Sequence, residues 1–279
     1  MTTRICITIV VENTAHVAGL RGEHGLACWV EADEFRLLFD TGQTGEILRH
    51  NTERLSIPLE GTEAIALSHG HYDHTGGLDT ALEMAPTALV YAHPDAFQPR
   101  YAGIPGGPCR EIGIPGLSEE DVRRRCGKLC LSRGPVTIAE GVWLSGEIPR
   151  VTDFETVETP FYLDPACKKP DRLPDDQALV LEAADGLVLL AGCAHSGIIN
   201  ILRHVQNLRP GSPVQAVVGG FHLSGASRER LEKTVLALRE NNVSRVVAGH
   251  CTGRDAVAYL SEKLGERAEP LTTGQKLEF

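Results

Sequence analysis

The residues with the strongest chemical signal in this chain are three histidines and one aspartate within six positions, His69, His71, Asp73 and His74. They follow a short apolar run, 64–67, that predicts a buried strand, and a Gly-rich turn comes after them. If the backbone stays extended from His69 to His71, both imidazoles project to one side. Asp73 and His74 then turn back toward the same space, so this strand end can supply two ligands to each of two neighbouring metal ions.

The ligand types narrow the choice of metal without fixing it. Zinc accepts imidazole nitrogen and carboxylate oxygen at roughly 2.0–2.2 Å. Iron and manganese accept the same ligands. A solvated loop rich in histidine is the structural alternative, but four ligand-type side chains in this packing are hard to explain as surface. We therefore expect two divalent transition-metal ions, with zinc the first choice and iron or manganese as alternatives.

Strand and helix patterns alternate on both sides of this stretch. The expected strands are 4–11, 26–31, 35–39, 64–67, 88–92, 136–144, 146–148, 177–182, 187–191, 214–218 and 243–248. The expected helices are 46–51, 78–84, 198–208, 227–241 and 254–264. Repeated strand–helix–strand units predict an α/β layered sandwich.

Several of these strands end on residues that bind metals. In layered α/β folds, ligands gather outside the carboxyl ends of the strands. Besides the strand before His69 and His71, three more apolar strands end on such residues: Cys193 with His195, His222, and His250. The same chemistry at four strand ends predicts that these side chains converge on one site.

The segment 94–172 differs from the rest, because Pro and Gly are dense in it. It predicts an insertion into a single domain of 1–279, placed as a cap over the site. Cys126 and Cys130 within it could belong to a second metal or redox site, with ordinary reduced cysteines as the alternative.

Eight cysteines in a chain without a recognisable secretory signal favour a reducing cytoplasm over a disulfide framework. Four of the eight lie in this segment: Cys109, Cys126, Cys130 and Cys167.

Composition excludes several classes of partner. The 279 residues are 42% hydrophobic, which is enough for a full core, and the formal net charge is −10. Duplex nucleic acid needs a patch of Lys and Arg, and no basic run is present. No apolar run approaches the roughly 20 residues of a membrane span. We expect a cytoplasmic protein that acts on a small molecule. A cationic metal site favours an anionic substrate, and a homo-oligomer is left open.

The pattern His-x-His-x-Asp-His at 69–74 resembles the signature of the metallo-β-lactamase superfamily, and a strand that ends at Asp40 resembles that superfamily's first motif. Together with other stretches it is similar to one branch, the proteins called 7,8-dihydropterin-6-methyl-4-(β-D-ribofuranosyl)-aminobenzene-5′-phosphate synthase-like. The other stretches are Glu23-His24-Gly25-Leu26, Asp175-Asp176-Gln177-Ala178-Leu179, Gly192-Cys193-Ala194-His195-Ser196-Gly197, Gly219-Gly220-Phe221-His222-Leu223 and Gly249-His250-Cys251-Thr252-Gly253.

The resemblance implies an αββα four-layer sandwich with an inserted cap, and it implies a ligand set for each metal. His69, His71 and His195 would surround one ion. Asp73, His74 and His250 would surround the second.

Four further residues take roles that the resemblance implies less sharply. Asp40 would support the metal-binding loop by hydrogen bonds, although a turn or N-cap role is the alternative. Cys193 stands where many relatives carry a bridging aspartate, so it binds metal as thiolate, leaves the bridge to water, or only packs. Asp176 would act as a supporting residue or ligand. His222 is expected to face the substrate, with a metal ligand and a core histidine as alternatives.

These roles imply a metal-dependent hydrolase that attacks a small ester or phosphoester with an activated water. Asp73 would orient or deprotonate that water, and His222 would stabilise charge on the substrate. The first alternative is a pterin-linked transferase, as the branch name implies. A di-iron redox enzyme is a second, but it would need extra carboxylate ligands and usually a flavin domain. A non-catalytic metal or ligand sensor is the third.

Overall fold

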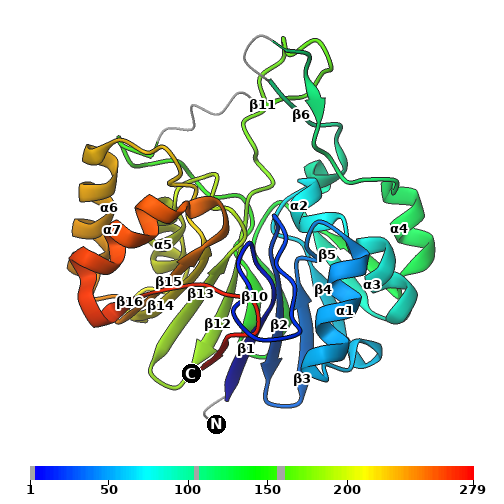
Figure 1. Ribbon diagram of the computed structural model, residues 1–279, viewed down its shortest axis with the longest axis horizontal. Helices are drawn as coiled ribbons and strands as arrows, with labels where there is room; N and C mark the ends of the chain where they lie inside the picture. The colour runs from blue at the N-terminus through cyan, green and yellow to red at the C-terminus, as the bar shows by residue number, and fades with distance from the viewer. Residues whose placement is uncertain (1–3, 104–106, 156–160) are drawn as a thin grey trace.

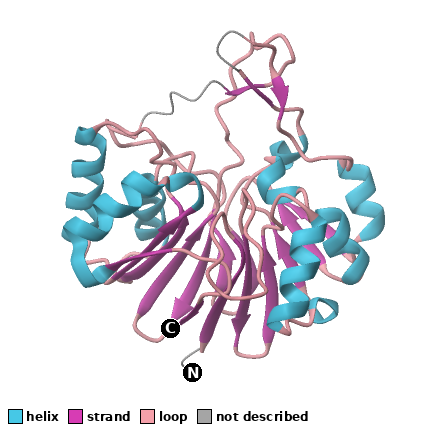
Figure 2. Cartoon of the chain, viewed as in Figure 1, coloured by secondary structure: helices cyan, strands magenta, loops and turns pink. Residues whose placement is uncertain are grey.

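Two large β-sheets pack face to face, and helices cover the outer face of each (Figures 1 and 2). The computed structural model describes residues 4–103, 107–155 and 161–279. The order of layers is helix, sheet, sheet, helix, as expected from the sequence. A small lobe projects from one end of the sandwich, at the end opposite the two termini (Figure 1).

The first sheet has seven strands and joins an antiparallel half to a parallel half. Strands β17, β1, β2 and β3 pair antiparallel, and β3, β4, β5 and β8 pair parallel. In order across the sheet, the strands are β17 (Lys276–Glu278), β1 (Ile5–Val11), β2 (Ala27–Ala32), β3 (Phe35–Phe39), β4 (Ala64–Ala66), β5 (Leu89–Ala92) and β8 (Lys128–Leu131).

The second sheet also has seven strands and repeats this plan. Strands β16, β15, β14 and β13 pair parallel, and β13, β12, β10 and β9 pair antiparallel. In order across the sheet, the strands are β16 (Ala268–Pro270), β15 (Arg245–Gly249), β14 (Val214–Gly220), β13 (Gly186–Ala191), β12 (Ala178–Ala183), β10 (Val142–Leu144) and β9 (Val136–Ala139). The expected strand at 136–144 is thus the hairpin β9–β10, and 146–148 is not a strand.

Helices lie on the outer face of each sheet (Figure 1). The first sheet is covered by α1 (Gly45–Leu55), α3 (Leu78–Met84) and α4 (Glu119–Arg125), and the second by α5 (Ile198–Leu208), α6 (Arg228–Glu240) and α7 (Arg254–Leu264). Single turns are α2 (Tyr72–Thr75), η1 (Leu59–Gly61), η2 (Pro94–Phe97), η3 (His250–Thr252) and η4 (Gly265–Arg267). Among the described residues, no helix is long and apolar enough to span a membrane.

Strand β13 shows why the sequence forms layers. Its side chains alternate between two cores, because successive residues of a strand point to opposite faces. Leu187 and Leu189 pack with α5, α6 and α7, whereas Val188 and Leu190 pack between the two sheets. A strand covered on both faces must be apolar throughout, and β13 is.

Only part of the segment 94–172, which was expected to be an insertion, lies outside the sandwich. Strand β8 is the edge of the first sheet, β9 and β10 belong to the second sheet, and α4 packs on the outer helical layer. Outside the sandwich lies a small three-stranded sheet, β11 (Phe161–Tyr162), β6 (Tyr101–Ala102) and β7 (Arg110–Glu111), which forms the lobe. The density of proline and glycine indicated the two segments that form the lobe. It did not indicate that the strands between them belong to the sandwich. Residues 104–106 and 156–160 of the insertion lie outside the described residues.

The lobe carries a disulfide between Cys109 and Cys167. This corrects the expectation that all the cysteines are reduced. Cys109 directly precedes β7, and Cys167 comes a few residues after β11, so the fold brings together two residues that lie 58 positions apart. Cys126 and Cys130 are free, and they belong to none of the metal-donor groups found among the described residues.

Candidate metal centre

Strand ends from both sheets meet at the end of the sandwich below the lobe (Figure 1). Strand β4 leads into the histidine-rich stretch, and β13, β14 and β15 lead into Cys193, His222 and His250. The carboxyl ends of parallel strands share one edge of a sheet, and here two such edges face each other. The predicted convergence of these ends is therefore what the structure shows.

Asp40, the residue after β3, holds the start of the histidine stretch through hydrogen bonds. Its side chain is fully buried, and its Oδ1 accepts the Ser68 backbone N–H at 2.7 Å. Its Oδ2 accepts the Ser68 hydroxyl at 2.6 Å and lies 2.7 Å from His74 Nδ1. The carboxylate therefore orients His74 so that Nε2 faces the centre, as the expected supporting role requires.

His69 and His71 face each other at the end of this strand. Ser68 Oγ lies 2.8 Å from His69 Nδ1, and His69 Nε2 lies 3.1 Å from His71 Nδ1. The two ring centroids are 4.6 Å apart. Both rings are buried, and His71 Nε2 has no hydrogen-bond partner among the described residues. The extended backbone predicted for 69–71 thus brings both imidazoles to the same space.

The second sheet contributes His195 and His250. The His195 ring centroid is 4.8 Å from that of His69, and neither of its buried ring nitrogens has a hydrogen-bond partner among the described residues. His250 Nε2 lies 3.1 Å from His74 Nε2 and 3.4 Å from Asp73 Oδ2. Its Nδ1 lies 3.0 Å from Asn13 Oδ1, which holds the other ring nitrogen toward the centre.

The ligand-type atoms form two adjoining groups that share Cys193. One group contains Asp73, His74, Cys193 and His250, and the other contains His69, Cys193 and His195, with the ligand atoms of each group within 4.8 Å of one another. Cys193 Sγ is 3.1 Å from His74 Nε2. His71 joins through its contact with His69. All six residues expected as metal ligands therefore lie together, and Cys193 lies between them.

Burial and charge set the protonation of these side chains. Burial lowers the pKa of His71 to about 3, and it lowers the pKa of His69 and His195 well below the usual range. Burial would also lower the pKa of His74, but the carboxylates of Asp40 and Asp73 outweigh it and raise this pKa to about 9. Neutral imidazoles are the form that binds metal, so His69, His71 and His195 are already in that form, whereas His74 would have to lose a proton to bind.

Asp176 supports the backbone next to His195, which comes from the second sheet. Its buried Oδ2 accepts the Ser196 backbone N–H at 2.8 Å, directly after His195. Burial raises the pKa of this carboxyl above its usual value. Asp176 is in none of the donor groups found among the described residues, so of its two expected roles the geometry favours support.

The structure adds two residues for which the sequence gave no signal strong enough to assign a role. His24 Nε2 lies 3.1 Å from Asp73 Oδ2, and the His24 side chain is about half exposed. Arg100 is buried and pairs with Asp171 at 2.5 Å and Asp175 at 2.7 Å. Asp175 also accepts the Gly70 backbone N–H at 2.8 Å, so this ion-pair network anchors the histidine stretch. Both new residues come from loops without periodicity.

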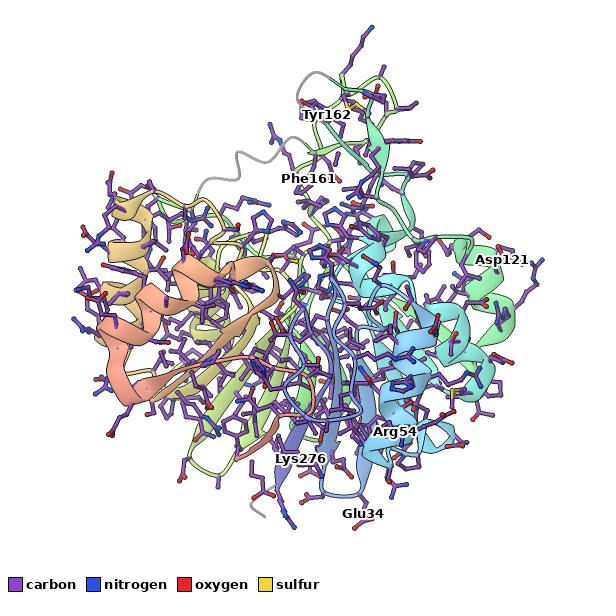
Figure 3. The ribbon with its side chains drawn as sticks, in the orientation of Figure 1. Glu34, Arg54, Asp121, Phe161, Tyr162 and Lys276 are labelled. Carbon is purple, nitrogen blue, oxygen red and sulfur yellow. A yellow bond between two sulfur atoms is a disulfide. The ribbon has the colours of Figure 1, made fainter. Side chains whose placement is uncertain are left out.

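The lobe covers part of the centre through Phe161. Its ring centroid lies 5.0 Å from that of His71 and 5.4 Å from that of His195. Figure 3 shows Phe161 on the underside of the lobe, at the sandwich end. One aromatic ring from the lobe therefore shields the imidazoles from solvent.

A four-layer αββα sandwich with His-x-His-x-Asp-His at the end of β4 defines a class of metal-binding proteins. The chain belongs to the metallo-beta-lactamase superfamily, whose family model matches residues 20–250. It is 31% identical to 7,8-dihydropterin-6-methyl-4-(beta-D-ribofuranosyl)-aminobenzene-5′-phosphate synthase of Methanocaldococcus jannaschii, over 92% of this chain and 90% of that protein. A second, uncharacterized protein of that archaeon is 35% identical, over 92% of this chain and 94% of its own length.

Among solved structures, the chain is similar to Tm1679, described as a metal-dependent hydrolase of the β-lactamase superfamily. The TM-score is 0.83 and the identity 29%, and the match covers 99% of each chain. Almost the whole chain is therefore covered by the shared fold.

Proposed function

We propose that this protein is a metal-dependent hydrolase of a small ester or phosphoester and that it works with two divalent transition-metal ions, zinc being the expected one. The observation that carries the proposal is the pair of donor groups that share Cys193. The similarity to Tm1679, described as a metal-dependent hydrolase, supports it. The net charge of −10 favours a small molecule over nucleic acid as substrate.

The residues present fit such ions. His195 has two buried ring nitrogens without hydrogen-bond partners among the described residues, which would be costly in a site built only for packing. The donors are imidazole, carboxylate and sulfur, the set that zinc accepts. His69, His71 and His195 would hold one ion, and Asp73, His74 and His250 the other.

The ions would supply Lewis acidity and make water a nucleophile near neutral pH. The protein's own part is to hold groups in place. Asp40 keeps His74 in one orientation, and Asn13 does the same for His250. Asp73 Oδ2 lies between His24 and His250, where it can accept a proton from an attacking water or orient it. Phe161 limits the access of bulk solvent.

The lobe would select the substrate. It stands over the strand ends, and its only described ring contacts with the centre's histidines come from Phe161. Arg110 of β7 donates from Nη2 to the Tyr72 hydroxyl at 3.2 Å, so the lobe also reaches the helical turn that carries Asp73. Loops placed on a rigid scaffold commonly carry selectivity.

A transferase is the second candidate, and one observation favours it: the 31% identity to the archaeal synthase spans nearly the whole chain. In this case the centre would bind the diphosphate of a dihydropterin while an aminobenzene ribofuranosyl phosphate displaces it. The same residues would serve, because metal ions also stabilise a leaving diphosphate.

An assay of zinc-loaded protein separates the two candidates. It measures hydrolysis of p-nitrophenyl phosphate, a phosphodiester and a small carboxylic ester, and in parallel the condensation of a dihydropterin diphosphate with the aminobenzene acceptor. Hydrolysis that is lost on chelation and in His71→Ala, but kept in His50→Ala, supports the hydrolase; His50 is a histidine of α1 outside the centre. Condensation without hydrolysis of any substrate would replace the hydrolase by the transferase.

A further inference from the structure

Three donor atoms at the ends of adjacent strands form a group distinct from the two described above. Cys193, His222 and Cys251 follow β13, β14 and β15, and their ligand atoms lie within 4.8 Å of one another. Cys193 is buried, and the other two are half-buried. His222 and Cys251 belong to neither of the two groups with Asp73 and His69.

The backbone between these residues is shaped so that the two sulfurs can approach. Strand β14 lies between β13 and β15 and ends on Gly219 and Gly220. A Cβ at Gly220 would lie only 2.7 Å from Cys251 Sγ and would also overlap the Gly192 carbonyl oxygen. Because the middle strand carries no side chain there, Cys251 Sγ reaches across it and lies 3.4 Å from the Cys193 carbonyl oxygen.

His222 is held in a conformation that L-residues rarely adopt. Its φ is +46°, and His250, directly before Cys251, has φ +51°. Left-handed residues other than glycine persist only where their surroundings impose them, and they concentrate at functional sites. His222 Nδ1 is buried and has no hydrogen-bond partner among the described residues. The ring centroid is 4.5 Å from that of His195, so the His222 ring adjoins the centre.

We propose that Cys193, His222 and Cys251 form a third, sulfur-rich site that binds a thiophilic ion of the zinc and cadmium class. Two thiolates and one imidazole are a ligand set on which zinc is found with a fourth position left open. Soft sulfur ligands select zinc, cadmium or Cu(I) over magnesium, calcium or manganese. Cys193 then serves as the common ligand, because a thiolate has lone pairs for more than one ion.

This assignment gives His222 the role of ligand, one of the alternatives open from its sequence, in place of the substrate-facing role. It goes beyond the hydrolase proposal, which needs neither His222 nor Cys251 as a ligand. The third site also differs from the other two in chemistry. Those groups have three and two histidines or carboxylates for their one sulfur, whereas the third has one histidine for two sulfurs. A metal with a strong preference for sulfur therefore distinguishes the third site from them.

The test is a titration of the chelator-treated full chain with ¹¹³Cd²⁺, followed by NMR and by elemental analysis. The chemical shift of bound cadmium separates ions with two sulfur ligands from ions with nitrogen and oxygen ligands. The matched variants are Cys251→Ser, which removes one proposed ligand, and Cys130→Ser, which alters a free half-buried cysteine of β8. Wild type and Cys130→Ser should show one signal typical of two sulfurs. Cys251→Ser should lose that signal and about one cadmium per chain.

Two further measurements keep the result decisive. His71→Ala should retain the sulfur-type signal, because His71 is in none of the three donor groups; loss of the signal in this variant as well would reject a separate site. If Cys251→Ser does not fold, X-ray absorption of the wild-type protein with one equivalent of cadmium replaces it, and fewer than two sulfur neighbours would overturn the proposal. These experiments measure bound cadmium and not hydrolysis. Their outcome therefore does not depend on whether the hydrolase proposal is correct.

Discussion

The two halves of the metal centre are built in different ways. The half from the first sheet is one continuous stretch, His69 to His74, supported by the buried carboxylates of Asp40 and Asp175. The half from the second sheet takes its candidate ligands from the ends of separate strands, β13 and β15, and Ala194, His222 and His250 at these and the neighbouring strand end all have positive φ. The first half is thus held mainly by hydrogen bonds from buried carboxylates. In the second half Asn13 holds the His250 ring, and the backbone alone positions the His195 ring among the described residues. Side-chain and backbone substitutions should therefore act unequally on the two halves.

The largest effect is expected from removing a ligand of the continuous stretch. His71→Ala should lower zinc affinity by more than about 100-fold, because the loss of a supporting residue alone typically costs 10–100-fold. Elemental analysis after dialysis measures the bound metal, with His50→Ala as the control. Full metal content in His71→Ala would show that the stretch does not bind through this ring.

The backbone of the second half should respond strongly to a single methyl group. Gly219 has φ +122°, and a Cβ there would overlap the Ala191 carbonyl oxygen. Gly219→Ala should lower the free energy of unfolding by about 2–6 kcal/mol, from backbone strain and overpacking together. Denaturant unfolding measures this.

Gly211→Ala is the control for that prediction, because Gly211 has φ +86° and open space around it. It should cost only about 1–2 kcal/mol. Equal losses in the two variants would mean that close packing at the end of β14 has no special role.

A matched pair of carboxylates sharpens the contrast between the halves. Asp40 contacts the ligand His74 directly, whereas Asp176 contacts the backbone next to His195. Asp40→Asn should weaken zinc binding by about 10–100-fold. Asp176→Asn should weaken it less than about tenfold, since no ligand atom loses its partner. Competition with a chromogenic chelator gives both affinities, and the reverse order would contradict the division described above.

The smallest effect is expected from the lobe, which contacts both halves. Phe161→Ala should raise KM by about two- to tenfold at unchanged metal content, because an aromatic contact contributes roughly 0.5–1.5 kcal/mol. Tyr162→Ala is the control, since neighbouring residues of a strand point to opposite faces; Figure 3 labels both residues. The measurement is steady-state kinetics on the substrate found for the zinc-loaded protein. A KM change shared by both variants would point to disruption of the lobe as a whole.

The same contrast explains what could be predicted from the sequence. His69, His71, Asp73 and His74 are adjacent in the chain, so their convergence needs only an extended backbone and a turn. Helices with clear apolar periodicity, such as α5 and α7, were predicted to the residue. The convergence of the strand ends was predicted in outline, because the carboxyl ends of parallel strands lie at the same edge of a sheet.

Other features depend on contacts that no local pattern records. The extent of the lobe was overestimated because β8, β9 and β10 lie between Pro- and Gly-rich segments. The pairing of Cys109 with Cys167 requires the lobe strands to be in register. Arg100 and Cys251 acquire partners only when distant loops pack together, so their residue types alone did not single them out.

Strand β17 has a consequence for the order in which the molecule is assembled. Its residue Glu278 pairs with Cys6 of β1, so the outer edge of the first sheet joins residues from nearly opposite ends of the chain. Contacts between such distant residues form slowly, because a very long loop has to close first. The strands of the second sheet, β9 to β16, by contrast follow one another in the chain, interrupted only by the lobe strand β11. We therefore expect the second sheet to fold early and the sheet that carries His69 to His74 to be completed last, so that metal capture is a late event in refolding.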